Sequence, residues 1–297
     1  MISLELIRLL RHIRNAGTLS QAAAQSGKAA SALTYQVDKY EDSLGITLLQ
    51  PHGRTIRLTE AAMHICEMGA DILNSVDSLE AQALAIGTGV EPRIRLAVDT
   101  WVSTDAVMSV ISDFLAEYPQ VKLQIEHQAL QGTWDALTTQ RVDLIVGAIA
   151  PKPAGSGVQI LPLGKTERVL AISPDHYLAK RGALLTDEDL EAARWVVIKD
   201  SSSMSPKRDL LPTTPQSVIL VDSLEAKLAA QIQGLGIGFL PPQVAKSMVL
   251  KGQLVEIKLD SRPPDIEMLL AWRTDSRGQG LIRLIDMFSS ADLLPQH

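Results

Sequence analysis

The order of short periodic segments in residues 1–58 constrains the fold of this chain more than any other feature. Two segments repeat apolar residues at helical spacing, the first at Leu6, Leu9, Leu10 and Ile13 and the second at Leu33, Val37, Tyr40 and Leu44. Between them, Thr18 or Ser20 can cap a short helix over 21–26. The three predicted helices end at Gly17, Gly27 and Gly45.

A hairpin is predicted next, because residues 46–58 contain two short strand patterns around His52, Gly53 and Arg54. Three short helices and a β-wing form a winged helix-turn-helix, in which the second helix of the motif enters the major groove of DNA. The predicted reading helix is the third one, whose polar face carries Ser31, Thr34, Tyr35 and Asp38. The same periodicity fits a plain three-helix bundle that binds no DNA.

Charge is distributed unevenly along the chain, whose net charge is −6. Residues 1–60 hold seven Lys or Arg and five Asp or Glu, a net +2, which leaves 21 basic and 29 acidic residues, a net −8, in the remainder. A small basic unit joined to a larger acidic body is typical of a DNA-binding head on a regulatory module. Arg54, Lys28 and Lys39 are predicted to lie near phosphates, where they add affinity without reading sequence.

A longer motif overlaps these helices. It consists of Gly17-Thr18-Leu19-Ser20-Gln21-Ala22-Ala23, Ser31-Ala32-Leu33-Thr34-Tyr35-Gln36-Val37, Glu41, Leu44-Gly45, Leu48, Arg54 and Leu58-Thr59-Glu60-Ala61. This pattern resembles the N-terminal signature of LysR-type transcriptional regulators. The resemblance implies that DNA is contacted by Lys28, Ala30, Ser31, Thr34, Tyr35 and Arg54. Tyr35 stands where the family often has arginine, so we expect it to contact a thymine methyl or a phosphate rather than a guanine edge.

A long helix is predicted from Thr59 to Gly87, because apolar residues recur every seven positions at Ile65, Ile72, Leu79 and Ile86. So short a heptad run also fits a helix packed on its own domain. The family resemblance instead implies a linker that pairs two chains into a homodimer, which assembles further into a homotetramer. The expected domains are a winged helix-turn-helix DNA-binding domain at 1–60, a linker and dimerisation helix at 61–90 and an effector-binding regulatory domain at 91–297.

Beyond Pro92, predicted strands alternate with predicted helices. Strands are expected at 94–98, 121–126, 143–148, 169–172, 195–198, 217–221 and 237–240, and helices at 106–117, 134–139 and 223–233. This alternation indicates parallel βαβ packing in two similar subdomains, with 266–272 and 281–288 returning to the first. The fold class is therefore α+β multidomain: an N-terminal winged helix-turn-helix, a long linker helix and a C-terminal two-subdomain α/β domain. That last domain resembles the LysR effector domain and the periplasmic binding proteins.

Two facing α/β subdomains are expected to enclose an effector cleft, because ligands bind beyond the carboxyl ends of the strands. The residues predicted to line this cleft are Asp99, Thr100, Trp101, Ser103, Leu130, Gln131, Gly147, Ser201, Ser202, Ser203 and Phe239. The three serines are expected to cap a helix or to donate hydrogen bonds to the effector. Asp99 is expected to disfavour an anion and to accept a hydrogen bond from an NH or OH group of the effector. Alternatively, Asp99 pairs with a basic residue or caps a helix.

The chain contains no G-x-S-x-G, HExxH, Walker A or CxxC sequence. It therefore lacks the motifs typical of hydrolases, metalloproteases, NTPases and redox proteins. We therefore expect no enzyme activity, metal or cofactor. Cys66 is the one cysteine of the sequence, so no intrachain disulfide can form. The first fifteen residues do not have the pattern of a signal peptide. Both observations predict a cytoplasmic location and no membrane partner.

The predicted function is a sequence-specific DNA-binding transcriptional regulator controlled by a small-molecule effector bound between the two α/β subdomains. The expected partners are a double-stranded DNA operator, the effector, further copies of the chain and RNA polymerase. The alternative is a small-molecule-binding protein or an enzyme of two-lobed α/β fold, with a helical head that binds no DNA. An exported solute-binding protein would need a signal sequence that the pattern lacks.

Overall fold

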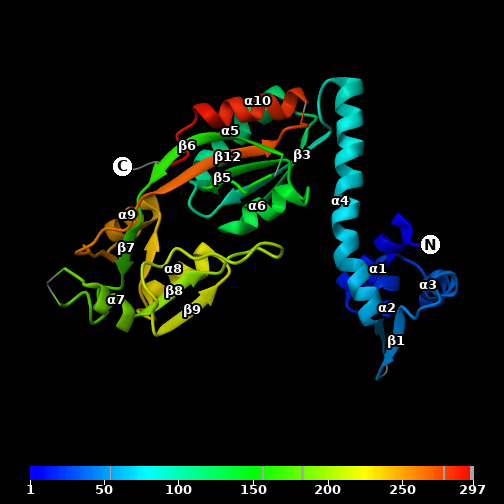
Figure 1. The fold of residues 1–297 in the computed structure, drawn as a ribbon, viewed down its shortest axis with the longest axis horizontal. Coiled ribbons are helices and arrows are strands. Elements are labelled where there is room, and N and C mark those ends of the chain that lie inside the picture. The colour runs from blue at the N-terminus through cyan, green and yellow to red at the C-terminus, as the bar shows by residue number, and fades with distance from the viewer. Residues whose placement is uncertain (54, 156, 182–183, 277, 295–297) are drawn as a thin grey trace. The chain divides into compact units, whose positions relative to one another are not determined.

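A computed structural model describes residues 1–53, 55–155, 157–181, 184–276 and 278–294. The chain divides into two compact units, 1–80 and 81–297 (Figure 1). The first unit contains α1 (Leu4–Ala16), α2 (Leu19–Gln25), α3 (Ala30–Leu44), β1 (Leu49–His52) and β2 (Thr55–Leu58), and β1 pairs antiparallel with β2. The predicted winged helix-turn-helix is therefore confirmed, and the wing residue Arg54 lies outside the described residues.

Local signals set the ends of these helices. Thr18, and not Ser20, caps α2, because its side-chain oxygen accepts a hydrogen bond from the backbone N–H of Gln21. Gly45 ends α3 in the left-handed conformation at φ 68°, which a residue without Cβ adopts at no steric cost. The predicted anchors Leu6, Leu10, Ile13, Leu33 and Val37 are buried in one cluster with Leu19 and Leu48.

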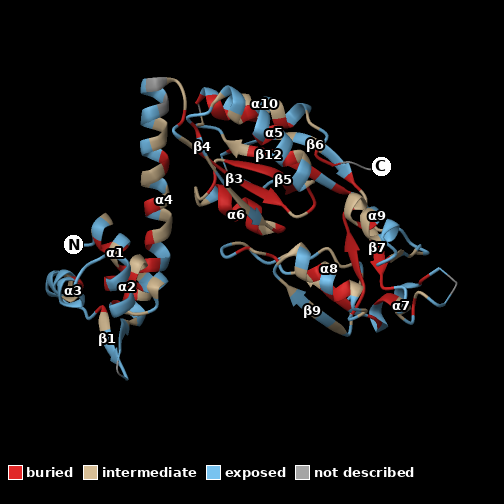
Figure 2. Ribbon diagram, turned by 180° about the vertical axis from the view of Figure 1, so that it is seen from behind, coloured by how far each residue is buried: buried red, intermediate tan, exposed pale blue. Residues whose placement is uncertain are grey.

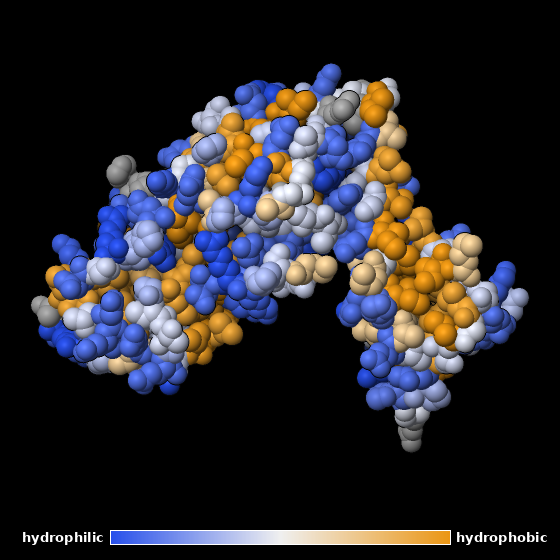
Figure 3. Space-filling view, in the orientation of Figure 1, coloured by the Kyte–Doolittle hydropathy of each residue, from blue (hydrophilic) through white to orange (hydrophobic). Residues whose placement is uncertain are grey.

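Helix α4 (Glu60–Thr88) follows the wing, and its first turns pack on the head through Ala62 and Cys66. Gly69 lies directly against α1, because a Cβ built on it would be 2.4 Å from Cγ2 of Ile7. Among the heptad residues, Ile65 packs on the same cluster of the head, whereas Ile72, Leu79 and Ile86 further along the helix are 50%, 65% and 80% exposed. Figure 3 shows hydrophobic side chains along α4. The helix is therefore amphipathic, with an apolar stripe that the described part of the chain does not cover.

The second unit has two lobes. The first lobe contains β3 (Arg93–Asp99), α5 (Thr104–Glu117), β4 (Lys122–Gln128), α6 (Gln131–Thr138), β5 (Leu144–Ile149), β6 (Val158–Thr166), β12 (Ile266–Arg273) and α10 (Gln279–Ser290). Its sheet has the order β4-β3-β5-β12-β6. Helices α5 and α10 cover one face and α6 covers the other (Figure 1). Both faces of β3 and β5 are consequently buried, which explains the apolar sequence of β5 and the apolar run Leu96 to Val98 in β3 (Figure 2).

The second lobe contains β7 (Val169–Ile172), α7 (Asp187–Ala192), β8 (Arg194–Ile198), β9 (Ser217–Val221), α8 (Leu224–Ile232), β10 (Gly238–Leu240), α9 (Pro242–Leu250) and β11 (Val255–Glu256). Strand β7 lies between β10 and β11, and β8 pairs parallel with β9. A bridge between Trp195 and Ile237 joins the two sets of strands. The expected second subdomain is therefore present.

The sheet of the first lobe differs from expectation in one respect. Strands β3, β4 and β5 are parallel, as predicted, but β12 runs antiparallel to both β5 and β6. The returning segment was placed in the correct lobe, whereas β6 was missed. Strand β6 contains Pro162 and Gly164 and lies at the edge of the sheet, where proline is tolerated. Its residues therefore do not show the pattern of a buried strand.

Candidate functional site

The polar face of α3 is open to solvent. Tyr35 is 71% exposed, and Lys28, Ala30, Ser31 and Asp38 are also exposed, while Leu33 and Val37 on the opposite side are buried. Thr34 is half-buried, and its hydroxyl donates to the backbone carbonyl of Ala30 at 3.0 Å. The predicted DNA contacts other than Arg54 thus lie together on one accessible surface, at and just before the start of α3.

Glu41 links this helix to the wing. Its Oε1 accepts hydrogen bonds from the backbone N–H groups of Leu48 and Leu49, the latter at 2.8 Å. At the other side of the head, Ser3 donates to the hydroxyl of Tyr40 at 3.1 Å. The two contacts fix α3 relative to β1 and to the start of α1. Sequence reasoning identified Glu41 as part of a motif but did not assign it this structural role.

An apolar cavity lies where the two lobes of the second unit meet. Its volume is about 60 Å³, and it is lined by Thr100, Trp101, Ala129, Leu130, Trp195, Val196, Val197, Ile198, Leu210, Leu211, Leu224, Lys227, Phe239 and Pro241. Four of the predicted effector residues are in this set, namely Thr100, Trp101, Leu130 and Phe239. The cavity has room for a few water molecules and is partly open to solvent rather than enclosed.

Asp99 lies behind the cavity wall. Its oxygens accept hydrogen bonds from the backbone N–H groups of Trp101 at 3.0 Å and Leu130 at 3.3 Å. Burial raises the pKa of the Asp99 carboxyl to about 7. The carboxylate therefore connects the end of β3 to the turn before α6, two segments that both contribute to the cavity.

Three other predicted residues are close to Asp99 in the fold. Ser103 caps α5 by accepting a hydrogen bond from the backbone N–H of Ala106 at 3.3 Å. Gln131 is the first residue of α6. Gly147 in β5 has φ 92°, and a Cβ there would lie 2.2 Å from Cγ2 of Val102. None of the three is among the described residues that line the cavity.

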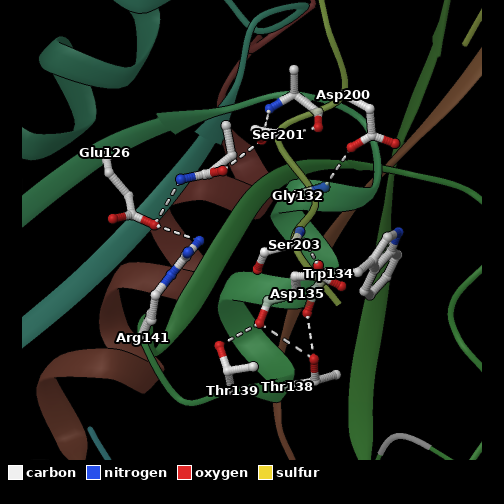
Figure 4. A network of polar contacts seen from close by, with 12 residues as sticks. Glu126, Gly132, Trp134, Asp135, Thr138, Thr139, Arg141, Asp200, Ser201 and Ser203 are labelled. Atoms are coloured by element: carbon white, nitrogen blue, oxygen red, sulfur yellow. Dashed lines mark hydrogen bonds and ion pairs between the residues drawn. The ribbon is translucent and has the colours of Figure 1, made fainter. Parts of the chain in front are cut away.

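The predicted serine cluster joins the two lobes. Ser201 donates to Oε1 of Gln128 at 2.6 Å and accepts a hydrogen bond from the backbone N–H of Ala129 at 3.0 Å. The backbone N–H of Ser203 donates to Asp135 on α6 at 2.8 Å, whereas that of Ser202 donates to Asp200 within the loop. Figure 4 shows this loop against α6. The three serines lie beside the cavity rather than in the set that lines it.

Two family models match this arrangement. Residues 4–63 match the bacterial regulatory helix-turn-helix protein of the lysR family, and residues 87–291 match the LysR substrate binding domain. This chain is a member of the LysR family. It is therefore a transcriptional regulator with a DNA-binding helix-turn-helix unit and an effector-binding domain.

Curated relatives agree with the assignment to the LysR family. The transcriptional activator AllS of Salmonella paratyphi A is 27% identical over 290 residues, which cover 97% of this chain and 94% of AllS. The transcriptional regulator YeeY of Escherichia coli K12 is 30% identical over 275 residues, covering 93% and 89%. The transcriptional regulator PunR of the same strain is 26% identical over 278 residues, covering 94% and 90%.

Solved structures share the fold. Full-length CbnR in complex with its target DNA superposes with a TM-score of 0.66 at 16% identity, covering 97% of this chain and 99% of CbnR. Full-length AphB, a virulence activator of Vibrio cholerae, superposes with a TM-score of 0.57 at 19% identity, covering 97% and 98%. The fold of this LysR regulator is thus the fold of full-length members of its family.

Two carboxylates of this LysR regulator were not predicted from its sequence. Asp135 on α6 accepts hydrogen bonds from the backbone N–H groups of Ser203, Met204 and Ser205 and from the Ser205 hydroxyl. Burial alone would raise the pKa of Asp135, but these hydrogen bonds outweigh it and hold the pKa below its usual value.

The second carboxylate, Asp200, accepts from the backbone N–H groups of Gly132 in the first lobe and of Ser202 and Arg208 in its own loop. Arg208 in turn donates to the backbone carbonyl of Ala150 at 3.0 Å. The loop 200–208 of the second lobe is thereby held on the first lobe at several points. Because the partners of Asp135 and of Gly132 are separated by 68 or more residues, the local sequence contains no signal for them.

Lys227 was also missed, since a lysine at helical spacing on α8 resembles a solvated residue. It is only 6% exposed, and its ammonium donates to the backbone carbonyl of Val196. Burial lowers the pKa of Lys227 to about 7. Near it, Trp195 and Phe239 have ring centroids 5.3 Å apart, and the Arg168 guanidinium lies 5.2 Å from the Phe239 ring.

Within the described ranges, no group of three or more His, Cys, Asp or Glu side chains is arranged to hold a metal ion. Nor does any described helix combine the length and the apolar character needed to cross a membrane.

Proposed function

We propose that this regulator recognises its operator through α3, using Lys28, Ala30, Ser31, Thr34, Tyr35 and Arg54, within a DNA-binding domain at 1–60. The observation that supports this most directly is the exposure of Tyr35 above the buried Leu33 and Val37. A rigid helix with short polar side chains on its accessible face suits the major groove. Lys28 and Arg54 would contact phosphates, which position the head without reading sequence.

The test is operator binding by a Thr34→Ala, Tyr35→Ala double variant. Genome-wide mapping of bound DNA first identifies an operator, and binding is then measured at fixed salt on specific and scrambled duplexes. We expect each lost base contact to weaken specific binding by about 1–3 kcal/mol. Asn15→Ala, an exposed change on α1, is the matched control. Unchanged specific affinity in the folded double variant would exclude α3 as the reader.

We further propose that α4, within a linker region at 61–90, pairs two chains into a homodimer. The argument rests on Ile72, Leu79 and Ile86, which leave an apolar stripe exposed on one chain. Burial of such a stripe against a second copy removes apolar surface from water at about 25 cal/mol per Å². A homodimer presents two reading helices to a two-fold operator, and further pairing would give a homotetramer.

For residues 91–297, we propose that a small-molecule effector binds at the cavity between the two lobes. Thr100, Trp101, Leu130 and Phe239 would contact it directly, since they line the cavity. Asp99, Ser103, Gln131, Gly147 and Ser201 to Ser203 would act from the surrounding segments. Because residues of both lobes line the cavity, binding would shift the equilibrium between closed and open lobes, and thereby the presentation of the DNA-binding heads. The AllS relatives are named activators, so we include RNA polymerase as a proposed partner.

A further inference from the structure

Lys227 places one buried positive charge in the wall of an apolar cavity. The fourteen described residues around the cavity include no Asp, Glu or Arg, so Lys227 is the charged member of this set. A lysine side chain usually extends its ammonium to water. Lys227 is instead buried, and only 6% of the residue is exposed. A charge in such surroundings is costly unless an opposite charge accompanies it.

The ammonium has capacity for further acceptors. A lysine carries three N–H donors, and the acceptor found for Lys227 among the described residues is the backbone carbonyl of Val196. Lys227 takes part in none of the ion pairs found among the described residues, and burial lowers its pKa to about 7. The buried amine therefore has no counter-ion among these side chains, and an anion placed beside it would favour its charged form.

Two carboxylates in segments that border the cavity accept hydrogen bonds from other groups. Asp99 accepts from the backbone N–H groups of Trp101 and Leu130, and Asp200 accepts from those of Gly132, Ser202 and Arg208. Neither belongs to the lining of the cavity. An anion beside Lys227 would therefore meet a cation and apolar walls instead of a carboxylate.

The rest of the lining selects the body of such a ligand. Trp101, Trp195 and Phe239 provide aromatic surface, and Leu210, Leu211 and Leu224 provide aliphatic surface. The Arg168 guanidinium on the Phe239 ring adds positive charge behind this wall. A single lysine among apolar groups suits one carboxylate on a compact apolar body, because a phosphate group carries up to two negative charges and three strong acceptor oxygens.

We propose that Lys227 is the anion-binding residue of the effector cavity and that the effector is a small carboxylate with an apolar body. This inference rests on the proposed effector site. It differs from the sequence-based hypothesis that Asp99 meets an NH or OH donor of the effector, and the two ideas predict opposite ligand preferences.

The experiment compares isosteric probes on the full-length chain. Benzoate is compared with benzamide and with benzylammonium, and 3-methylbutanoate is compared with 3-methylbutanamide. The affinity of each probe is measured by calorimetry and by tryptophan fluorescence. We expect each carboxylate to bind the wild-type chain at least tenfold more tightly than its amide. No carboxylate preference, an absence of binding by every probe, or tightest binding of benzylammonium would overturn the proposal.

Lys227→Met is the informative variant, because methionine keeps the length of the side chain and removes the charge. We expect its carboxylate preference to fall below twofold, while a variant that keeps the wild-type preference would refute the role of Lys227. Lys227→Gln provides a second neutral replacement if the methionine variant does not fold. The control is Lys246→Met on α9, where the lysine is exposed and the preference should be unchanged.

Operator binding is measured on the same preparations to separate this inference from the proposed function. A wild-type chain that binds carboxylates through Lys227 but no operator would contradict the DNA-reading proposal and support the anion site. A chain that binds its operator and shows no carboxylate preference would contradict the anion site alone.

Discussion

Gly132 in the first lobe and Ser201 in the second lobe approach so closely that a Cβ on Gly132 would lie 1.8 Å from Oγ of Ser201 and 2.8 Å from its backbone carbon. The backbone N–H of Gly132 also donates to Asp200 at 3.2 Å. Only a residue without a side chain permits this contact. Gly132 therefore allows the 200–208 loop to hold the two lobes together.

Gly132→Ala should accordingly loosen the contact between the lobes. The backbone atom of Ser201 cannot move away without displacing its loop, so we expect a loss of about 1–3 kcal/mol in the free energy of unfolding. The measurement is urea unfolding of the full-length chain. Gly87→Ala in α4 is the control, since a Cβ there meets nothing within 4 Å, and it should be neutral or stabilising. Equal effects of the two substitutions would contradict the close contact.

The buried Asp99 predicts how stability depends on pH. Its pKa is about 7 in the folded chain and about 4 when unfolded, so the folded state retains the proton to higher pH. Stability should therefore fall as pH rises between these values, by about 2 kcal/mol from pH 5 to pH 7. Lys227, whose pKa in the folded chain is also about 7, begins to lose its proton only near the upper end of this range and there gives a small change of the opposite sign.

Asp99→Asn checks that assignment, because an amide does not titrate and can still accept one of the two backbone hydrogen bonds. Urea unfolding at pH 5, 6 and 7 should show a flatter profile for the variant than for the wild-type chain. Asp113→Asn, at an exposed position on α5, should leave the profile unchanged. A wild-type slope that persists in Asp99→Asn would assign the titration to another group.

The contact between Ile7 and Gly69 predicts a non-additive pair. Gly69→Ala places a Cβ against Cγ2 of Ile7 and should destabilise the head by about 1–3 kcal/mol. Ile7→Ala should cost about 2–4 kcal/mol through the cavity it leaves. The double variant should cost less than the sum of the two, because truncation of Ile7 makes room for the new methyl group. Additive effects in a double-mutant cycle would argue against direct packing.

Leu79→Glu should weaken dimerisation. It places a charge in the exposed apolar stripe of α4, where a partner helix would have to bury it. Sedimentation velocity over a range of concentrations should show a shift from dimer toward monomer. Asn74→Glu adds the same charge about 140° around the helix from Leu79 and should leave the association unchanged. Indistinguishable association of wild type and Leu79→Glu would remove α4 as the dimer contact.

Much of the fold could be predicted from local signals. The glycines at 17 and 45, the cap at Thr18 and the spacing of Leu33 and Val37 act within a few residues, so the head was correctly predicted from its sequence. The apolar runs of β3 and β5 likewise indicated buried strands. Strand order was harder, because β12 and β6 pair across about a hundred residues of intervening chain.

The candidate site was predicted in part. Strand-end reasoning selected Thr100, Trp101 and Leu130, which do line the cavity, because the carboxyl ends of the parallel strands β3 and β4 share one edge. Phe239, also selected, lines the cavity from the middle of β10, which is antiparallel to β7. It did not select Lys227, since nothing in the local sequence around α8 distinguishes a buried lysine from a solvated one. Nor did it anticipate that Asp135 and Asp200 would bind backbone N–H groups of a distant loop and helix.

The sequence by itself determined which segments are helices and strands, which faces are apolar and to which family the chain belongs. These properties depend on spacing and caps, and such interactions operate over one or two turns of chain. The tertiary structure decided which charges are buried and which glycines touch a neighbour. Those outcomes depend on segments that are far apart in sequence, and a lysine such as Lys227 becomes a buried cation only when β8, α8 and β10 close around it.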